Sequence, residues 1–140
     1  MTITSMNSKW MIAMKKLLLI TLLFSSPLFA KEITVGQVCK AAAASMFDRD
    51  HKTMKLDKVE SGIAYVHYIR PVDNSRWAIK CKLMGDQVMW ASDNPDSTGR
   101  WRDDPADSVV RFSVEGKKLT LSEIYSDGSS TTNTYPLKEL

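Results

Sequence analysis

The chain has 140 residues, of which 44% are hydrophobic and 25% are charged. This composition is typical of an ordinary folded protein and excludes a disordered tail or a fibrous repeat. The formal net charge is +3, but Lys9, Lys15 and Lys16 precede every acidic residue, and the segment 31–140 is formally neutral. Net charge therefore gives no support for nucleic-acid binding, and we expect no nucleic-acid partner.

Residues 1–30 have the pattern of a leader that contains a secretory signal peptide. Two lysines after Met14 precede the largely apolar run 17–24, which is followed by Ser-Ser-Pro and then by Ala30. This order predicts cleavage after Ala30, with Met14 as the natural start of translation. A membrane span needs roughly 20 apolar residues, so we expect no stable anchor after cleavage. The sequence thus predicts a single mature domain over 31–140, periplasmic or secreted, in a bacterial envelope.

Two cysteines in an exported chain predict one disulfide, here between Cys39 and Cys81. Cys39 lies on the apolar stripe of a predicted helix, and Cys81 lies on the apolar face of a predicted strand. A redox pair or two metal ligands are the alternatives, but the chain has neither a C-x-x-C motif nor a His/Cys cluster. We therefore expect a structural disulfide, and no metal or cofactor.

The predicted elements are one helix followed by short strands. The helix runs from about Val35 to Phe47, with Thr34 as its cap and four alanines at its centre. Period-two patterns separated by turn residues then predict strands over 53–60, 63–70, 76–84, 87–92, 109–115, 118–126 and 131–137. A change of apolar parity between Leu121 and Ile124 indicates a bulge.

These elements predict an α+β domain, with an N-terminal helix packed on a curled antiparallel sheet of six or seven strands. A small half-open barrel is the close variant. The segment 93–108 is the longest break, because two prolines and many turn-forming residues exclude a long regular element there.

Catalytic motifs are not evident, since the chain lacks a G-x-S-x-G elbow, a P-loop and an H-E-x-x-H pair. His67 lies in mid-strand, and a hydrogen-bonded histidine in or near the core is favoured over a general base, which needs a positioned partner. His51 is expected to be solvated in a polar turn after the helix. Asp104 and Asp107 are interpreted as a helix start around Pro105 rather than as part of a cation site.

The most informative stretch is Arg100-Trp101-Arg102, within the longest loop. Tryptophan and arginine are enriched at the energetic centres of protein interfaces, so these three residues are the predicted binding site. The alternative is that Trp101 covers the open end of the sheet while the arginines pair with nearby aspartates, because large aromatic side chains seldom remain exposed.

The resulting hypothesis is a small exported binding protein without catalysis, directed at another protein and of the inhibitor or immunity type. That class rests on size, export and the disulfide rather than on a site. Two alternatives stay open: a hydrolase of envelope polymers that uses His67, and a small barrel that binds a lipid or sugar fragment.

Overall fold

The computed structural model describes residues 32–140, and Ile33–Leu140 form one compact unit. The predicted leader, residues 1–30, lies outside the described residues. Helix α2 spans Val35–Phe47. The Thr34 hydroxyl accepts a hydrogen bond from the Gln37 N–H, and the Gln37 side chain accepts one from the Thr34 N–H. This reciprocal capping box fixes the first turn where the sequence places it.

Seven strands follow the helix in one antiparallel sheet, and each strand pairs with the next along the chain. They are β1 (Lys55–Glu60), β2 (Ile63–Arg70), β3 (Ser75–Met84), β4 (Gln87–Ser92), β5 (Val109–Glu115), β6 (Lys118–Ile124) and β7 (Ser130–Pro136). Short 3-10 helices cover His51–Thr53 and Leu137–Glu139.

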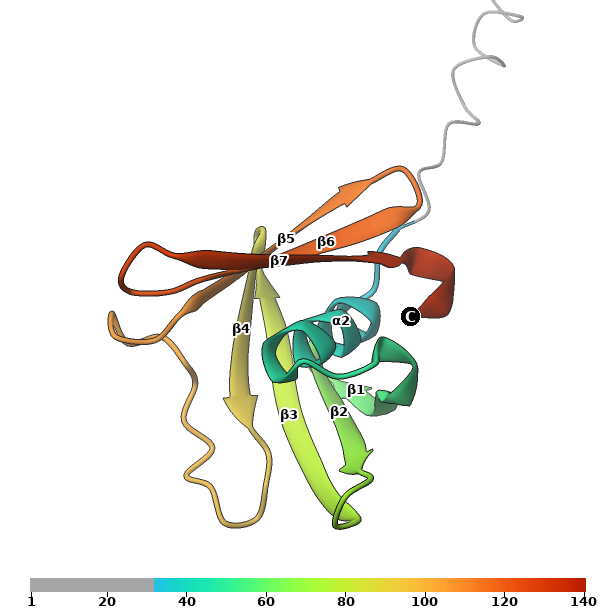
Figure 1. Ribbon diagram of the computed structural model, residues 1–140, viewed down its shortest axis with the longest axis vertical. Helices are drawn as coiled ribbons and strands as arrows, with labels where there is room; N and C mark the ends of the chain where they lie inside the picture. The colour runs from blue at the N-terminus through green and yellow to red at the C-terminus, as the bar shows by residue number, and fades with distance from the viewer. Residues whose placement is uncertain (1–31) are drawn as a thin grey trace, which may run out of the picture. The chain divides into compact units, whose positions relative to one another are not determined.

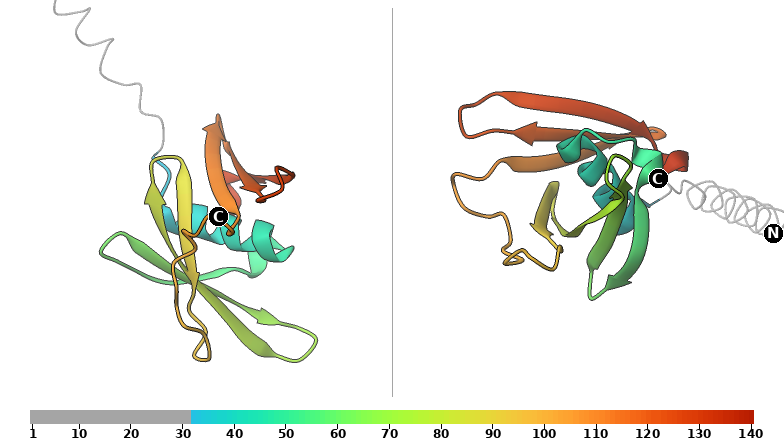
Figure 2. Two further views of the ribbon diagram at one scale, coloured as in Figure 1. Left: turned by 90° about the vertical axis from the view of Figure 1, so that its left-hand side faces the viewer. Right: turned by 60° about the horizontal axis from the view of Figure 1, so that its bottom comes forward.

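The sheet curls around α2 to form a half-barrel (Figures 1 and 2). The helix packs against strands from both ends of the sheet, from β1 to β7. The side of the sheet that packs on α2 is called the inner face here, and the opposite side is the outer face. A helix on a curled antiparallel sheet is thus confirmed, with seven strands and in the half-open variant.

The sheet has two halves that are joined weakly. Strand β4 pairs with β5 at only two positions, Gln87 with Arg111 and Val88 with Val110, whereas the other neighbouring strands pair over most of their lengths. The first half is β1–β4 and the second half is β5–β7. In Figure 1 the strands of the second half cross those of the first, as a strongly curled sheet requires.

The alanine-rich centre of α2 lets the helix backbone approach the inner face closely. All four residues of Ala41–Ala44 are buried, and their small side chains leave room for Val66, Leu119 and Leu121 of the sheet in the same core. Close-packed interiors of this kind supply most of the stability of a small domain through apolar burial.

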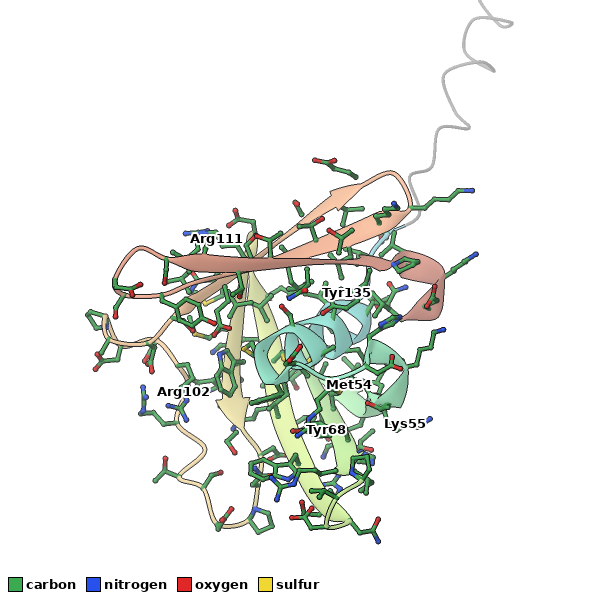
Figure 3. The ribbon with its side chains drawn as sticks, in the orientation of Figure 1. Met54, Lys55, Tyr68, Arg102, Arg111 and Tyr135 are labelled. Atoms are coloured by element: carbon green, nitrogen blue, oxygen red, sulfur yellow. A yellow bond between two sulfur atoms is a disulfide. The ribbon has the colours of Figure 1, made fainter. Side chains whose placement is uncertain are left out.

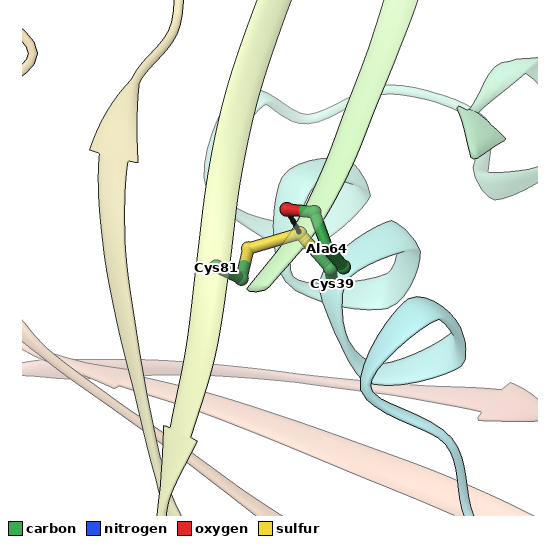
Figure 4. Close-up of a disulfide and its surroundings, with 3 residues drawn as sticks. All are labelled: Cys39, Ala64 and Cys81. Carbon is green, nitrogen blue, oxygen red and sulfur yellow. Dashed lines mark hydrogen bonds between the residues drawn. A yellow bond between two sulfur atoms is a disulfide. The ribbon is translucent and has the colours of Figure 1, made fainter. Parts of the chain in front are cut away.

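The predicted disulfide between Cys39 and Cys81 is confirmed, and it joins α2 to β3 (Figure 4). The two Cα atoms lie 5.7 Å apart, which is within the normal range for disulfides. Both cysteines are completely buried, and the Cys39 sulfur lies 3.9 Å from the carbonyl oxygen of Ala64 on β2. The bond therefore holds the helix over the first half of the sheet.

The predicted bulge in β6 is wrong, because β6 pairs with both neighbours in continuous register. The apolar parity changes for another reason: Glu123 faces inward and is buried, while Ile124 faces outward and is exposed. The Glu123 carboxylate accepts hydrogen bonds from Ser108 and Tyr125, at 2.6 and 3.0 Å, which offsets the cost of burying it.

The irregularity of the sheet lies instead in β1. The register shifts between Leu56 and Lys58, so that Asp57 is the extra residue and Lys58 pairs with Tyr65, whose side chain lies on the outer face. The weak alternation of this segment, predicted as a strand over 53–60, reflects this shift.

Candidate functional site

Trp101 and Arg102 are consecutive residues, but their side chains lie on opposite faces of the sheet. The Arg102 N–H donates a hydrogen bond to the Trp90 carbonyl at 2.9 Å, and the Asp103 N–H donates one to the Trp101 carbonyl at 3.0 Å, so the chain makes a tight turn at Arg102 beside β4. The Arg102 guanidinium lies over the ring of Trp90, which shares the inner face with Cys81. The Trp101 ring lies instead against Lys80 and Lys82 on the outer face.

Arg102 lies against a small pocket at the C-terminal end of α2. The pocket has a volume of about 160 Å³ and is lined by Phe47, Trp77, Ala78, Ile79, Trp90, Ser92, Asn94 and Arg102. The Phe47 ring lies edge-on to Trp90, with 6.0 Å between the ring centroids. This feature is called the arginine–aromatic pocket below.

Three guanidinium groups stack on aromatic rings in and beside this pocket. Measured from the guanidinium carbon to the ring centroid, the pairs are Arg49 with Tyr68 at 5.5 Å, Arg70 with Trp77 at 4.9 Å and Arg102 with Trp90 at 5.2 Å. Contacts of this geometry are attractive because the ring face is negative. The Arg102 and Tyr68 side chains are labelled in Figure 3.

A chain of hydrogen bonds fixes the orientation of Trp77 in the pocket wall. Its indole N–H donates to the Ser75 hydroxyl at 2.8 Å, and that hydroxyl donates to Asp73 at 2.7 Å. Asp73 also binds the guanidinium of Arg70. The hydrogen bonds from Arg70 and Ser75 hold the pKa of the Asp73 carboxyl far below its usual range.

The loop that carries Arg102 is held by Asp107. The Asp107 carboxylate accepts two hydrogen bonds from Arg100, at 2.8 and 3.1 Å, and one from the Asp104 N–H at 3.0 Å. The Arg102 guanidinium lies 3.8 Å away. Hydrogen bonding by Arg100, aided by the Asp104 N–H and by both arginine charges, lowers the pKa of Asp107 to about 2.

The predicted helix start at Asp104 is wrong. The segment forms a single turn, closed by a 2.9 Å hydrogen bond from the Asp107 N–H to the Asp104 carbonyl, and the chain enters β5 at Val109. Because the Asp107 carboxylate is engaged by Arg100 and the β5 ladder competes for the next residues, the capping residues end as a turn.

Two donors in the pocket wall have no acceptor within the described residues. They are the indole N–H of Trp90 and the Nε–H of Arg102, and both atoms are shielded from solvent. A buried donor without a partner costs roughly 1–3 kcal/mol, and such groups are rare in native proteins. Where Arg102 contacts Trp90, the pocket wall therefore holds two buried donors that could each donate a hydrogen bond to a ligand.

The three residues of the predicted site do not form one surface. Arg102 belongs to the pocket, Arg100 is exposed but engaged by Asp107, and Trp101 is half-buried on the outer face. There, the ammonium nitrogens of Lys82 and Lys80 lie 4.3 and 4.9 Å from its ring centroid. In the alternative expectation, Trp101 covers the open end of the sheet while the arginines pair with nearby aspartates. Its second part matches the contacts of Arg100 and Arg102 with Asp107.

The sequence reasoning missed Phe47, Trp77 and Trp90 as pocket residues. The signal for the two tryptophans was parity, because Trp77 lies on the same side of β3 as Cys81, and Cys81 pairs with Trp90 of β4. No local signal indicated Phe47, whose contact with Trp90 depends on how α2 lies over the sheet.

His67 has an acidic partner, but on the face opposite to the pocket. Its Nδ1 atom lies 2.8 Å from a carboxylate oxygen of Asp57, and Arg76 binds the other oxygen at 2.9 Å. His67 pairs with Ala78 on the outer side of β2 and β3. The pair and the pocket are therefore separated by the sheet.

His51 is not solvated as expected. Its side chain is only 18% exposed, and its Nε2 atom lies 2.9 Å from the Glu139 carboxylate. Its ring also packs against Tyr135, with 5.1 Å between the centroids. The C-terminal 3-10 helix thus folds back onto the turn that follows α2, which the local sequence pattern does not indicate.

Among residues 32–140, no three His, Cys, Asp or Glu side chains gather closely enough to hold a metal ion. No helix in this part of the chain is long and apolar enough to cross a membrane. Comparison of the chain with protein-family models, curated proteins and solved structures gave no match.

Proposed function

We propose that the protein is an exported, non-catalytic binding protein of the bacterial envelope that recognises another protein, in the manner of an inhibitor or immunity factor. The observation that supports this proposal most directly is the arginine–aromatic pocket. Its size and its lining both support a site for one side chain of a partner.

The pocket is smaller than a site for a drug-sized molecule. Pockets for drug-sized molecules have volumes of roughly 300–1,000 Å³, whereas this pocket has about 160 Å³. A cavity of about 150 Å³ accommodates a benzene ring. The pocket therefore suits a single ring-sized side chain, which is how a protein partner inserts an anchor residue into a concave surface.

The lining of the pocket favours a particular ligand chemistry. The pocket wall combines aromatic rings with the guanidinium of Arg102. Aromatic walls favour a ring or an aliphatic side chain, and a guanidinium favours a carboxylate, which it can bind through two hydrogen bonds. The preferred ligand is thus an apolar side chain next to a carboxylate. A partner's C-terminal residue or an acidic–aromatic pair would present both groups.

The other two hypotheses gain less from the structure. For a hydrolase, His67 and Asp57 are close, but Arg76 binds the same carboxylate and the pair faces away from the pocket. For a lipid or sugar barrel, the space inside the curl is filled by α2, whose alanines and Cys39 are buried against the sheet.

A pair of small probes tests the pocket directly. N-acetyl-L-phenylalanine carries a ring and a carboxylate, and its amide carries the same ring without the charge. We expect the acid to shift the indole and backbone NMR signals of Trp77 and Trp90, and to bind at least about tenfold more tightly than the amide. Equal affinity for both probes, or no shift at either tryptophan, contradicts the proposal.

Two matched arginine variants complete this test. Arg102→Gln removes the pocket guanidinium and should abolish the preference for the acid. Arg111→Gln removes an exposed arginine of β5 that pairs with Asp86 and does not line the pocket. This variant should bind both probes with the affinities of the unchanged protein.

Crosslinking from the pocket wall should capture the natural partner. A photoreactive amino acid at Asn94, in the pocket wall, should crosslink the chain to a protein of the cell envelope. The same group at Glu115, an exposed residue outside the pocket, should not. A crosslink that is unchanged in the Arg102→Gln background would mean that the partner does not use the pocket.

A further inference from the structure

Among residues 32–140, strand β7 is a free edge of the sheet. It pairs with β6 through seven residue pairs in continuous register, and the sheet ends there. Figures 1 and 2 show no strand beyond it. Residues 130–134 are all exposed. This edge is separate from the proposed function, because no residue that lines the arginine–aromatic pocket lies on β5, β6 or β7.

The hydrogen bonds at the two ends of the β6–β7 hairpin identify the backbone groups on the free edge. The Tyr125 N–H donates to Ser129, and the Leu137 N–H donates to Lys117, at 2.8 and 2.9 Å. In an antiparallel pair, hydrogen-bonded and non-hydrogen-bonded pairs alternate. The groups of residues 131, 133 and 135 are therefore used by β6, and those of Thr132 and Thr134 point away from the sheet.

The other edge of the sheet, β1, is protected against pairing along its length, whereas β7 carries only Pro136 at its end. Strand β1 carries Lys55, Asp57, Lys58 and Glu60, and its register is interrupted by a bulge. Charges and bulges on an edge strand block the addition of another strand. The segment Ser130–Pro136 has no charged residue and three threonines, which favour extended structure.

We propose that β7 is a self-association site, at which a second copy of this chain adds its own β7 in antiparallel orientation. The two copies would be related by a twofold axis at Asn133. Thr132 would then form a hydrogen-bonded pair with Thr134 of the partner subunit, and Thr134 would form one with Thr132 of the partner subunit. Both residues present their backbone groups to the free edge, so this register uses them fully.

Side chains favour the same register. On the outer face, Thr120 and Thr134 hydroxyls lie 3.0 Å apart, and Ser122 and Thr132 hydroxyls lie 3.3 Å apart. Pairing about Asn133 places a threonine opposite a threonine at the next step, so these hydroxyl ladders continue into the partner subunit. The strand has no charge, and no like charges meet across the axis.

A single strand pair buries little surface, so the dimer should be weak and should depend on concentration. The protein is purified in the form that the cell produces and is studied by sedimentation equilibrium over roughly a hundredfold concentration range. The average mass should rise from that of one copy towards that of two. A protein that stays monomeric throughout this range overturns the proposal.

Two variants locate the contact. Thr134→Pro removes an outward N–H that β6 does not use, which an edge strand tolerates. Thr134→Lys adds the charge that protects natural edges. We expect each variant to raise the dissociation constant at least about tenfold. Near-ultraviolet circular dichroism checks that each variant retains the fold. If the proline variant does not fold, the dissociation constant of Thr134→Lys alone tests the proposal.

Ser122→Lys is the matched control. It places the same charge on the same face and breaks the equivalent hydroxyl pair, but one strand further from the edge. Its dissociation constant should change much less than that of Thr134→Lys. A dimer that is unaffected by both Thr134 variants, or weakened equally by the control, would place the contact elsewhere.

Discussion

The two halves of the sheet are built from the same kind of strand, but they are held in different ways. The first half, β1–β4, is fastened to α2 by the Cys39–Cys81 disulfide and by Phe47 packing against Trp90 and Tyr68. The second half, β5–β7, has no covalent link to the helix. It is held by Leu119 and Leu121 in the core and by polar contacts such as Asn133 with Ser45.

This difference also separates the two proposed binding surfaces. The first half carries the arginine–aromatic pocket, where charged and aromatic groups are held by hydrogen bonds. The second half carries the uncharged edge β7. A cross-linked half keeps a shaped pocket in place, whereas pairing at an edge needs only extended backbone. Rigidity thus lies where side-chain recognition would need it.

The largest expected effect comes from removing the cross-link. The double substitution Cys39→Ala and Cys81→Ala should lower the free energy of unfolding by about 2–5 kcal/mol, the usual range for small exported domains. Denaturant unfolding measures the change. If the two halves differ as described, amide protection should fall more in β2 and β3 than in β6. An equal loss in both halves would show that the disulfide stabilises the sheet as one unit.

The next effect is expected at the junction of the halves. Val110 is 2% exposed and pairs with Val88 across the junction, so Val110→Ala should cost about 1.5–3 kcal/mol through lost apolar burial and the space left behind. Val114 points to the same side of β5 but is 41% exposed. Val114→Ala should therefore cost less than about 0.5 kcal/mol. Similar losses would mean that the junction is not a tightly packed contact.

The loop that connects the halves should respond to pH. The pKa of Asp107 falls from its ordinary value of 3.8 to about 2 on folding. A depressed pKa gives stability that is complete above the unfolded value and is lost as the pH falls through the folded value. The melting temperature should therefore drop between about pH 4 and pH 2, and the drop should be smaller in Asp107→Asn. An equal fall of the melting temperature with pH in both proteins would exclude the contacts of Asp107 with Arg100 and Arg102 as its cause.

The smallest expected effect concerns the hydroxyl ladder of the second half. Thr120→Ala removes the hydroxyl that contacts Thr134, and cross-strand pairs of this type contribute roughly 0.2–1 kcal/mol. Thr131→Ala is the control, because its hydroxyl makes no hydrogen bond within the described residues. A larger loss than about 1 kcal/mol would mean that the second half depends on its surface more than on its core.

Local signals in the sequence account for most of the elements. The capping residue Thr34 and the alanine run fix the helix, and alternation with turn residues gives strands such as β2 and β4 at their observed bounds. The predictions that are wrong concern side chains whose environment is set by residues distant in the sequence. Glu123 tolerates the inward position that it shares with Leu119 and Leu121 because Ser108 and Tyr125 donate hydrogen bonds to its carboxylate. His51 is covered because the chain end returns to it.

The candidate site shows the same limit. The sequence singled out Arg100, Trp101 and Arg102 by composition, which is a local property. Their separation onto two faces depends on the turn that the chain makes at Arg102, which is fixed by the Arg102–Trp90 and Asp103–Trp101 backbone hydrogen bonds.

The sequence by itself therefore determined the helix, the strands and their α+β arrangement, because periodicity and capping act over a few residues. It also determined the Cys39–Cys81 pairing, because two cysteines allow only one intramolecular bond. Only the tertiary structure decided where the sheet divides, which strand edge is left free and which aromatic rings surround Arg102. Those outcomes depend on contacts between residues far apart in the chain, whose geometry is set by the curl of the sheet around α2.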